Sequence, residues 1–121
     1  MEPTEYREMT DYERAVLDRL LIVDFVGAEV ARRVARTARV STMDECGCIE
    51  FEQFEDPPAR TGPRVVAIGS GPRDADGTPV EVMLTLRGDR PLWLEFHRYS
   101  GDNNFWPEPD EWVIGPYSAV P

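Results

Sequence analysis

The spacing of apolar residues along the chain changes near residue 46, from a helical period to the alternation of β-strands. Before that point, a first set recurs every three or four positions: Tyr12, Val16, Leu17, Leu20 and Leu21. Thr10 and Glu13 stand just ahead of it with the spacing of a capping box, in which a hydroxyl and a carboxylate satisfy free amides at a helix start. We therefore expect a helix over about 11–23.

A second helical pattern follows an interruption at residues 24–27. Its apolar stripe is formed by Val26, Val30, Val34 and Ala38. Four arginines lie in or just after its C-terminal half, where positive charge complements the helix dipole: Arg32, Arg33, Arg36 and Arg39. The short connection predicts that the two helices pack as a helical hairpin.

Four strand-like runs follow, at about 46–54, 64–69, 79–87 and 91–99. Their connections are short and rich in turn residues, which favours antiparallel pairing of consecutive strands. The sequence thus predicts one α+β domain over 1–121, with the helical hairpin packed on one face of a four-stranded antiparallel meander sheet. Residues 1–9 are expected to be frayed, and 100–121 to form an irregular Trp/Pro-rich tail in which Val113 and Ile114 could add a short strand.

Alternation along the strands separates a core face from an outer face. The predicted core face carries Ile49, Phe51, Val80, Val82, Leu84, Leu86, Leu92, Leu94 and Phe96. The predicted outer face carries Cys46, Cys48, Glu50, Glu52, Glu81, Met83, Thr85, Trp93, Glu95, His97 and Tyr99. A shift of one residue in register would exchange the two faces.

Net charge narrows the classes of partner. The formal charge is −10, and residues 44–56 include six acidic side chains and no basic one. Such a field repels nucleic acid and anionic membranes and attracts basic proteins, so we expect a protein partner and neither of the other two. Every basic side chain is arginine, which we attribute to a GC-rich genome, and we expect a bacterial protein.

The cellular location is suggested by the termini and the cysteines. The first residues are acidic and lead into no apolar stretch, so the sequence shows no signal-peptide pattern. No apolar run approaches the roughly 20 residues of a membrane span. Cys46 and Cys48 are too close along a strand to favour a mutual disulfide, and free thiols suit a reducing compartment. These features predict a cytoplasmic protein.

One candidate for chemistry is a metal site made by Cys46, Cys48 and His97, with Glu50 or Glu95 as a fourth zinc ligand. The same cysteines could serve as nucleophiles with His97 as the base, although nearby acidic residues would raise a thiol pKa and oppose this. Structural zinc sites usually use paired C-x-x-C elements, so two ordinary thiols and a histidine bound to a partner group explain the pattern better. We expect no catalytic residue and no cofactor.

The outer face is the main candidate for partner binding, because aromatic residues surrounded by acidic ones are typical of an interface core with a charged rim. Its candidate residues are Glu50, Glu52, Glu81, Met83, Trp93, Glu95 and Tyr99. Alternatively, the tail folds over this face and buries Trp93 against Trp106 or Trp112. The leading hypothesis is an acidic protein-binding module, of the kind found in immunity proteins and antitoxins. A metal protein or enzyme built on Cys46, Cys48 and His97, and a homo-oligomeric structural subunit such as a homodimer, are the alternatives.

Three segments resemble a known pattern: Asp74-Ala75-Asp76-Gly77-Thr78-Pro79-Val80 with Leu84 and Leu86, Leu92-Trp93-Leu94-Glu95-Phe96, and the helix with Glu13, Leu17, Leu20 and Leu21. Together they are similar to a family of small uncharacterised bacterial α+β proteins, a domain of unknown function. The resemblance covers residues 10–100 and implies a fold without an activity, so it assigns no functional residue. The arginine-rich second helix and the tail do not match it.

Overall fold

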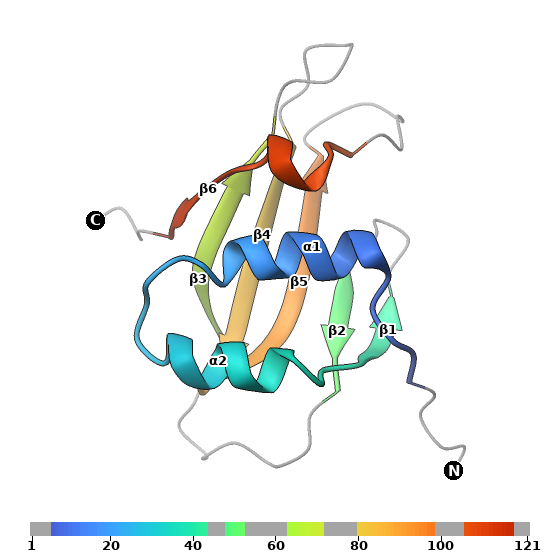
Figure 1. Ribbon diagram of the computed structural model, residues 1–121, viewed down its shortest axis with the longest axis vertical. Coiled ribbons are helices and arrows are strands. Elements are labelled where there is room, and N and C mark those ends of the chain that lie inside the picture. Colours follow the sequence, from blue (N-terminus) through green and yellow to red (C-terminus); the bar gives the residue numbers. More distant parts are fainter. Residues whose placement is uncertain (1–5, 44–47, 53–62, 72–79, 99–105, 118–121) are drawn as a thin grey trace.

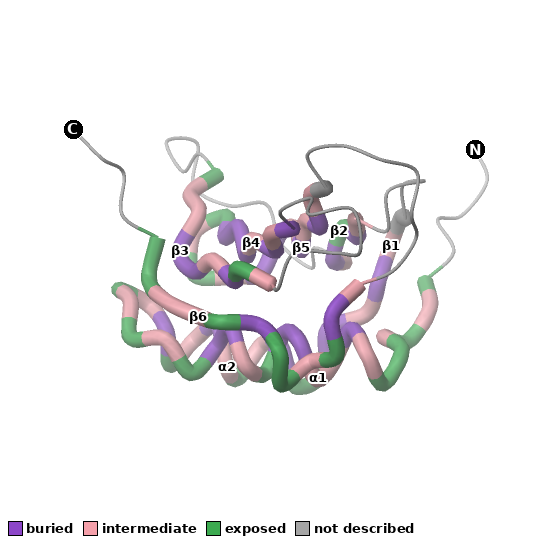
Figure 2. The backbone as a smooth tube through the Cα atoms, turned by 90° about the horizontal axis from the view of Figure 1, so that it is seen from above, coloured by how far each residue is buried: buried purple, intermediate pink, exposed green. Residues whose placement is uncertain are grey.

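The computed structural model describes residues 6–43, 48–52, 63–71, 80–98 and 106–117. Its elements are α1 (Asp11–Leu20), α2 (Ala28–Ala35), β1 (Val40–Met43), β2 (Ile49–Phe51), β3 (Pro63–Ser70), β4 (Val80–Arg87), β5 (Arg90–Arg98), the 3-10 helix η1 (Pro109–Glu111) and β6 (Val113–Pro116). The strands form one antiparallel sheet, and both helices lie on the same face of it (Figures 1 and 2). The predicted α+β class is confirmed. Among the described residues, no helix is long and apolar enough to cross a membrane.

The order of strands differs from the predicted four-stranded meander. Six strands are arranged as β1-β2-β5-β4-β3-β6, so only β3, β4 and β5 form a meander. The first predicted run, now β2, pairs with β5 instead of β3. The length of the connection permits this order: the 11 residues from 52 to 62 can reach up to about 36 Å, whereas the three strand spacings from β2 to β3 are only about 14 Å.

The two edge strands are short. β1 was not predicted, and the candidate short strand at Val113 and Ile114 is confirmed as part of β6. Arg7 lies along the free side of β1 and exchanges two backbone hydrogen bonds with Val40 (3.0 and 2.8 Å). Just after β6, the Tyr117 N–H donates to the Val66 carbonyl (3.2 Å), so the preceding residue, Pro116, turns its nitrogen away from β3.

Alternation predicted the core face correctly, because all nine residues assigned to it are buried. Val16, Leu17, Leu20 and Leu21 of the first helical pattern are buried against the same cluster. The helical spacing of the first helix and the alternation along the strands therefore identified the core residues of the helix layer and of the sheet. The packing of the two helices on each other as a hairpin stays a prediction. Hydrogen bonds join the two segments, from Arg14 to the Ala35 carbonyl and from Arg32 to the carbonyls of residues 21–23.

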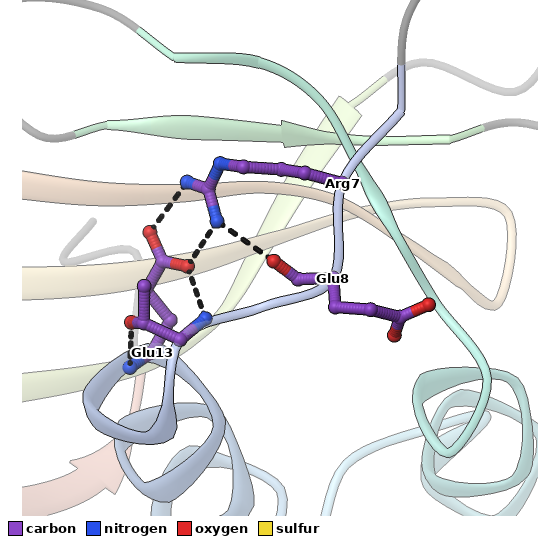
Figure 3. A network of polar contacts seen from close by, with 4 residues as sticks. Arg7, Glu8 and Glu13 are labelled. Carbon is purple, nitrogen blue, oxygen red and sulfur yellow. Dashed lines mark hydrogen bonds and ion pairs between the residues drawn. The ribbon is translucent and has the colours of Figure 1, made fainter.

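The start of α1 has the capping box that the sequence predicted. The Thr10 hydroxyl accepts the Glu13 N–H (3.1 Å), and the Glu13 carboxylate accepts the Thr10 N–H (2.9 Å). Arg7 adds a bidentate pair to the same carboxylate at 2.8 and 2.9 Å, and also donates to the Glu8 carbonyl (Figure 3). The helix ends at Leu20, three residues before the predicted end, and the N-terminal segment is fixed to it from Arg7 onward.

The face of α2 that packs inward is not the predicted one. Of the predicted stripe, Ala38 is buried just after the helix, but Val26 is 83% exposed and Val30 and Val34 are only half-buried. The buried residues of the helix itself are Ala28, Ala31 and Ala35. Alanine presents a single methyl group, so the helix backbone can approach the sheet closely, chiefly at β5. Valine on that face would hold the helix away, which is why the more hydrophobic stripe turns outward.

Substitutions at the buried face of α2 and at the exposed Val26 just before the helix should therefore differ in their effect on stability. Ala31→Val is expected to lower the free energy of unfolding by about 1–2 kcal/mol through overpacking. Val26→Ser removes an exposed side chain and is expected to change it by less than about 0.5 kcal/mol. Urea unfolding followed by circular dichroism measures both, and a larger loss for Val26→Ser would reverse the assignment of the faces.

Ahead of β6, residues 106–112 of the tail pack on the helix side of the sheet. Trp112 is 1% exposed, and the Trp112 and Trp106 rings lie 6.2 and 5.4 Å from that of Phe96, a core-face residue. The Tyr12 hydroxyl donates to the Pro107 carbonyl (2.6 Å), which ties the tail to α1. The alternative in which these tryptophans cover the outer face and bury Trp93 is therefore wrong.

Candidate partner-binding surface

The outer sheet face is defined by the side chains of β2, β5, β4 and β3 that point away from the helices. Its cross-strand neighbours form three rows: Glu50 with Trp93 and Thr85, Glu95 with Met83 and Ile68, and His97 with Glu81 and Ser70. Apolar side chains lie along the middle of β4 and β3, and acidic ones lie chiefly on β2 and β5. The face thus combines an apolar centre with an acidic border.

Trp93 occupies the centre of the first row. Its indole N–H donates to the Glu50 carboxylate (3.1 Å) across the β2–β5 pair, and its ring lies beside Thr85, which is 3% exposed. The hydrogen bond fixes the ring of a half-buried tryptophan in one orientation. An aromatic side chain held in this way loses little conformational freedom when it binds a partner.

The second and third rows carry Glu95 and His97, which lie two residues apart on β5 and therefore share the outer face. Their side chains are in contact, with 3.0 Å between His97 Nε2 and Glu95 Oε2. The Glu95 side chain is 29% exposed and the His97 side chain is 40% exposed, so both reach solvent. Glu81 lies opposite His97 on β4, so the acidic side chains of the face lie on three strands, β2, β5 and β4.

Glu52 differs from the other predicted surface residues. Its carboxylate is only 7% exposed and forms a bidentate pair with Arg39 at 2.8 and 2.9 Å. The hydrogen bonds with Glu52 raise the pKa of Arg39, whose guanidinium also lies 5.0 Å from the centre of the Tyr6 ring. This carboxylate is already neutralised inside the protein, and we leave it out of the proposed surface.

Two of the predicted site residues, Cys46 and Tyr99, lie outside the described residues. Cys48 is described: its sulfur accepts the Phe96 N–H (3.3 Å) and donates to the Phe96 carbonyl (3.5 Å). Within the described ranges, no three His, Cys, Asp or Glu side chains group closely enough to hold a metal ion. The predicted set of Cys46, Cys48 and His97 stays untested, because one of its members is not described.

Sequence analysis did not include the β6 side of this surface. Val113 is 75% exposed and Tyr117 is 44% exposed, and Val113 is paired with Ser70 at the end of the third row. The alternating apolar residues of the predicted 64–69 strand and the Val113-Ile114 pair were the available signals. What the sequence did not provide was the pairing of β6 with β3.

Two cavities lie on the other side of the molecule, next to α2. One, of about 430 Å³, is lined by Asp18, Leu21, Ile22, Arg32 and Arg36. The other, of about 380 Å³, lies beside Phe25 and the first turn of α2. Both are bordered by acidic and basic side chains together, so neither favours a partner of one charge.

Comparison with known proteins adds no identification: no family model, curated protein or solved structure matches the chain. The resemblance of residues 10–100 to a bacterial domain of unknown function therefore stays a prediction. The candidate surface has to be interpreted from its own chemistry.

Proposed function

We propose that this protein is a protein-binding module that uses the outer sheet face to bind a basic protein partner. One observation carries the proposal. Trp106 and Trp112 pack against Phe96 on the helix side, and among the described residues neither helix lies over the outer face (Figure 2). The half-buried Trp93 and its acidic neighbours are therefore not covered by the helices or by these two tryptophans.

The side chains of this face suit such a role. Protein interfaces are enriched in tryptophan and methionine at their centre, and Trp93 and Met83 lie on adjacent strands here. Glu50 and Glu95 flank the tryptophan at the border of the face. A charged border of this kind speeds association with an oppositely charged protein and selects against partners of the same charge.

The net charge of −10 extends the same preference over the whole molecule, since a strongly acidic protein attracts a basic one over distances of about a Debye length. This combination fits an immunity or antitoxin-like role, in which an acidic protein neutralises a basic toxin by covering it. No catalytic step is part of this proposal.

The test is capture of a partner by tagged protein from its native lysate, followed by affinity measurement with variants of the outer face. Glu50→Arg with Glu95→Arg is expected to weaken binding at least about tenfold, and Trp93→Ala by a similar factor, because charge complementarity and an aromatic anchor are both removed. Binding should also fall as salt is raised.

Asp18→Arg with Glu29→Arg is the matched control, because it makes the same total charge change at exposed positions of α1 and α2, on the opposite side of the molecule. It should keep at least half of the wild-type affinity. If the outer-face variants bind as tightly as the wild type while their circular dichroism is unchanged, the site lies elsewhere. Light scattering of the purified protein reports whether a second copy occupies the face instead.

A further inference from the structure

We infer that the partner-binding surface continues across β3 onto β6, and that the partner presents an apolar side chain there together with a basic one at the acidic border. This inference rests on the proposed function and specifies the chemistry of the partner. It depends on the side chains of β6, which lie outside the acidic part of the face.

The pairing of β6 with β3 decides which of its side chains point outward. Ile114 points to the core side, since its Cδ1 would lie 2.8 Å from a Cβ placed on Gly69. Alternation then places Val113, Gly115 and Tyr117 on the outer side. Their exposure agrees, with Val113 at 75% and Tyr117 at 44%.

Gly115 stands between these two exposed side chains and opposite Ile68. A Cβ at this position would meet nothing within 4 Å, and the positive-φ glycines of the described residues are Gly27 and Gly88 only. Neither crowding nor backbone conformation therefore requires a glycine here. Its effect is to leave the space between Val113 and Tyr117 open beside the partly buried Ile68.

An apolar side chain from a partner fits this place, because it would contact Val113, Ile68 and Tyr117 together. From Gly115 the second row continues through Ile68 and Met83 to Glu95, one residue on each of four neighbouring strands. Three strand spacings amount to about 14 Å along the sheet. A basic side chain that reaches Glu95 therefore lies about four residues from the apolar one in an extended segment.

Three blocked pentapeptides test this arrangement by titration of the ¹⁵N-labelled protein in NMR. The first is acetyl-Leu-Ser-Thr-Ser-Arg-amide, the second replaces its leucine with serine, and the third replaces its arginine with glutamate. We expect the first to bind most tightly, with shifts at Ile68, Val113, Gly115 and Glu95. Loss of the leucine should weaken binding about tenfold, the value of burying one aliphatic side chain.

Variants of the protein localise the contact. Gly115→Leu fills the open space and is expected to reduce the affinity for the leucine peptide to that for the serine peptide. Val113→Ser should weaken only the leucine peptide, whereas Val26→Ser, an equally exposed valine on the α2 side, should change nothing. Thermal unfolding should show that all three variants keep the wild-type fold.

The outcomes separate the two proposals. Equal binding of the leucine and serine peptides, with shifts confined to Trp93 and Glu95, overturns the apolar subsite and leaves the acidic face in place. Equal binding of the arginine and glutamate peptides contradicts the charge preference on which the proposed function itself depends. Absence of any shift overturns the proposed combination of an apolar contact beside Gly115 and a basic contact at Glu95. The proposed function is tested separately, by the affinity of the captured partner for the variant that carries Glu50→Arg and Glu95→Arg.

Discussion

Trp112→Ala is expected to lower the free energy of unfolding by about 3–5 kcal/mol, the range for deletion of a large aromatic side chain from a core. The indole is 1% exposed, packs near Phe96, and donates from its N–H to the Tyr12 hydroxyl (3.3 Å). Arg19 donates to the backbone carbonyl of Trp112 (2.7 Å), so the residue joins the tail to α1 by packing and by hydrogen bonding. Loss of the ring leaves a cavity between α1, β3 and β5. Urea unfolding followed by tyrosine and tryptophan fluorescence measures the change.

Trp93→Ala provides the matched comparison, because it makes the same truncation on the other side of the sheet. Trp93 is only half-buried, and its loss is expected to cost about 1 kcal/mol. A Trp93→Ala variant that is destabilised as strongly as Trp112→Ala would mean that the outer face is a second core. That result would remove the basis for the binding surface.

Glu13→Gln is expected to lower the free energy of unfolding by about 2 kcal/mol at pH 7, because hydrogen bonds to charged groups contribute more than neutral ones. Burial alone would raise the pKa of Glu13, but hydrogen bonds from Arg7 and from the Thr10 N–H outweigh it and hold the pKa below its ordinary value. A carboxyl group with a lowered folded-state pKa stabilises the protein above its unfolded pKa of about 4.3. That contribution is lost as the pH falls through the folded-state pKa.

Unfolding curves of the wild type and Glu13→Gln should therefore converge as the pH falls from about 5 towards 2. Glu8→Gln is the control. The Glu8 side chain points away from Arg7, and the residue contributes only its backbone carbonyl to the contact (Figure 3). The free energy of unfolding of the Glu8→Gln variant should match that of the wild type at neutral pH. A constant difference between wild type and Glu13→Gln over the whole range would show that the carboxylate charge is not what stabilises the start of α1.

How far the sequence could predict this fold depended on the size of the side chains involved. In β4 and β5, large aliphatic and aromatic residues alternate with polar ones, so Leu84, Leu94 and Phe96 identify the core side without ambiguity. In α2 the inward face is made of alanines, whose small burial energy is exceeded by that of the outward valines. A prediction based on hydrophobicity therefore placed Val30 and Val34 on the buried face. In the structure Ala31 and Ala35 are buried there, because small side chains let the helix approach the sheet closely.

Long-range pairing was the other limit. Short turns identify the β4–β5 neighbours, but the connection from Phe51 to Pro63 is long enough to reach several positions in the sheet, and local sequence does not choose among them. The tail illustrates the same difficulty, since Trp112 is selected for the helix side by contacts with Tyr12, a hundred residues earlier. In the candidate surface, alternation correctly grouped Glu50, Trp93 and Glu95. It could not show that Glu52 is buried against Arg39 or that β6 extends the surface.

The edges of the sheet limit how a partner can be recognised. At β6, Pro116 turns a nitrogen without a hydrogen towards the open side, and at β1 the Val40 N–H and carbonyl are both occupied by Arg7. Many peptide-binding domains capture a ligand by adding it as an extra strand, which needs a continuous row of free backbone donors and acceptors. Here that row is interrupted at each edge, which also opposes edge-to-edge association of copies in concentrated solution. Specificity must then come from the side chains of a face, so it can change through substitutions that leave the backbone as it is.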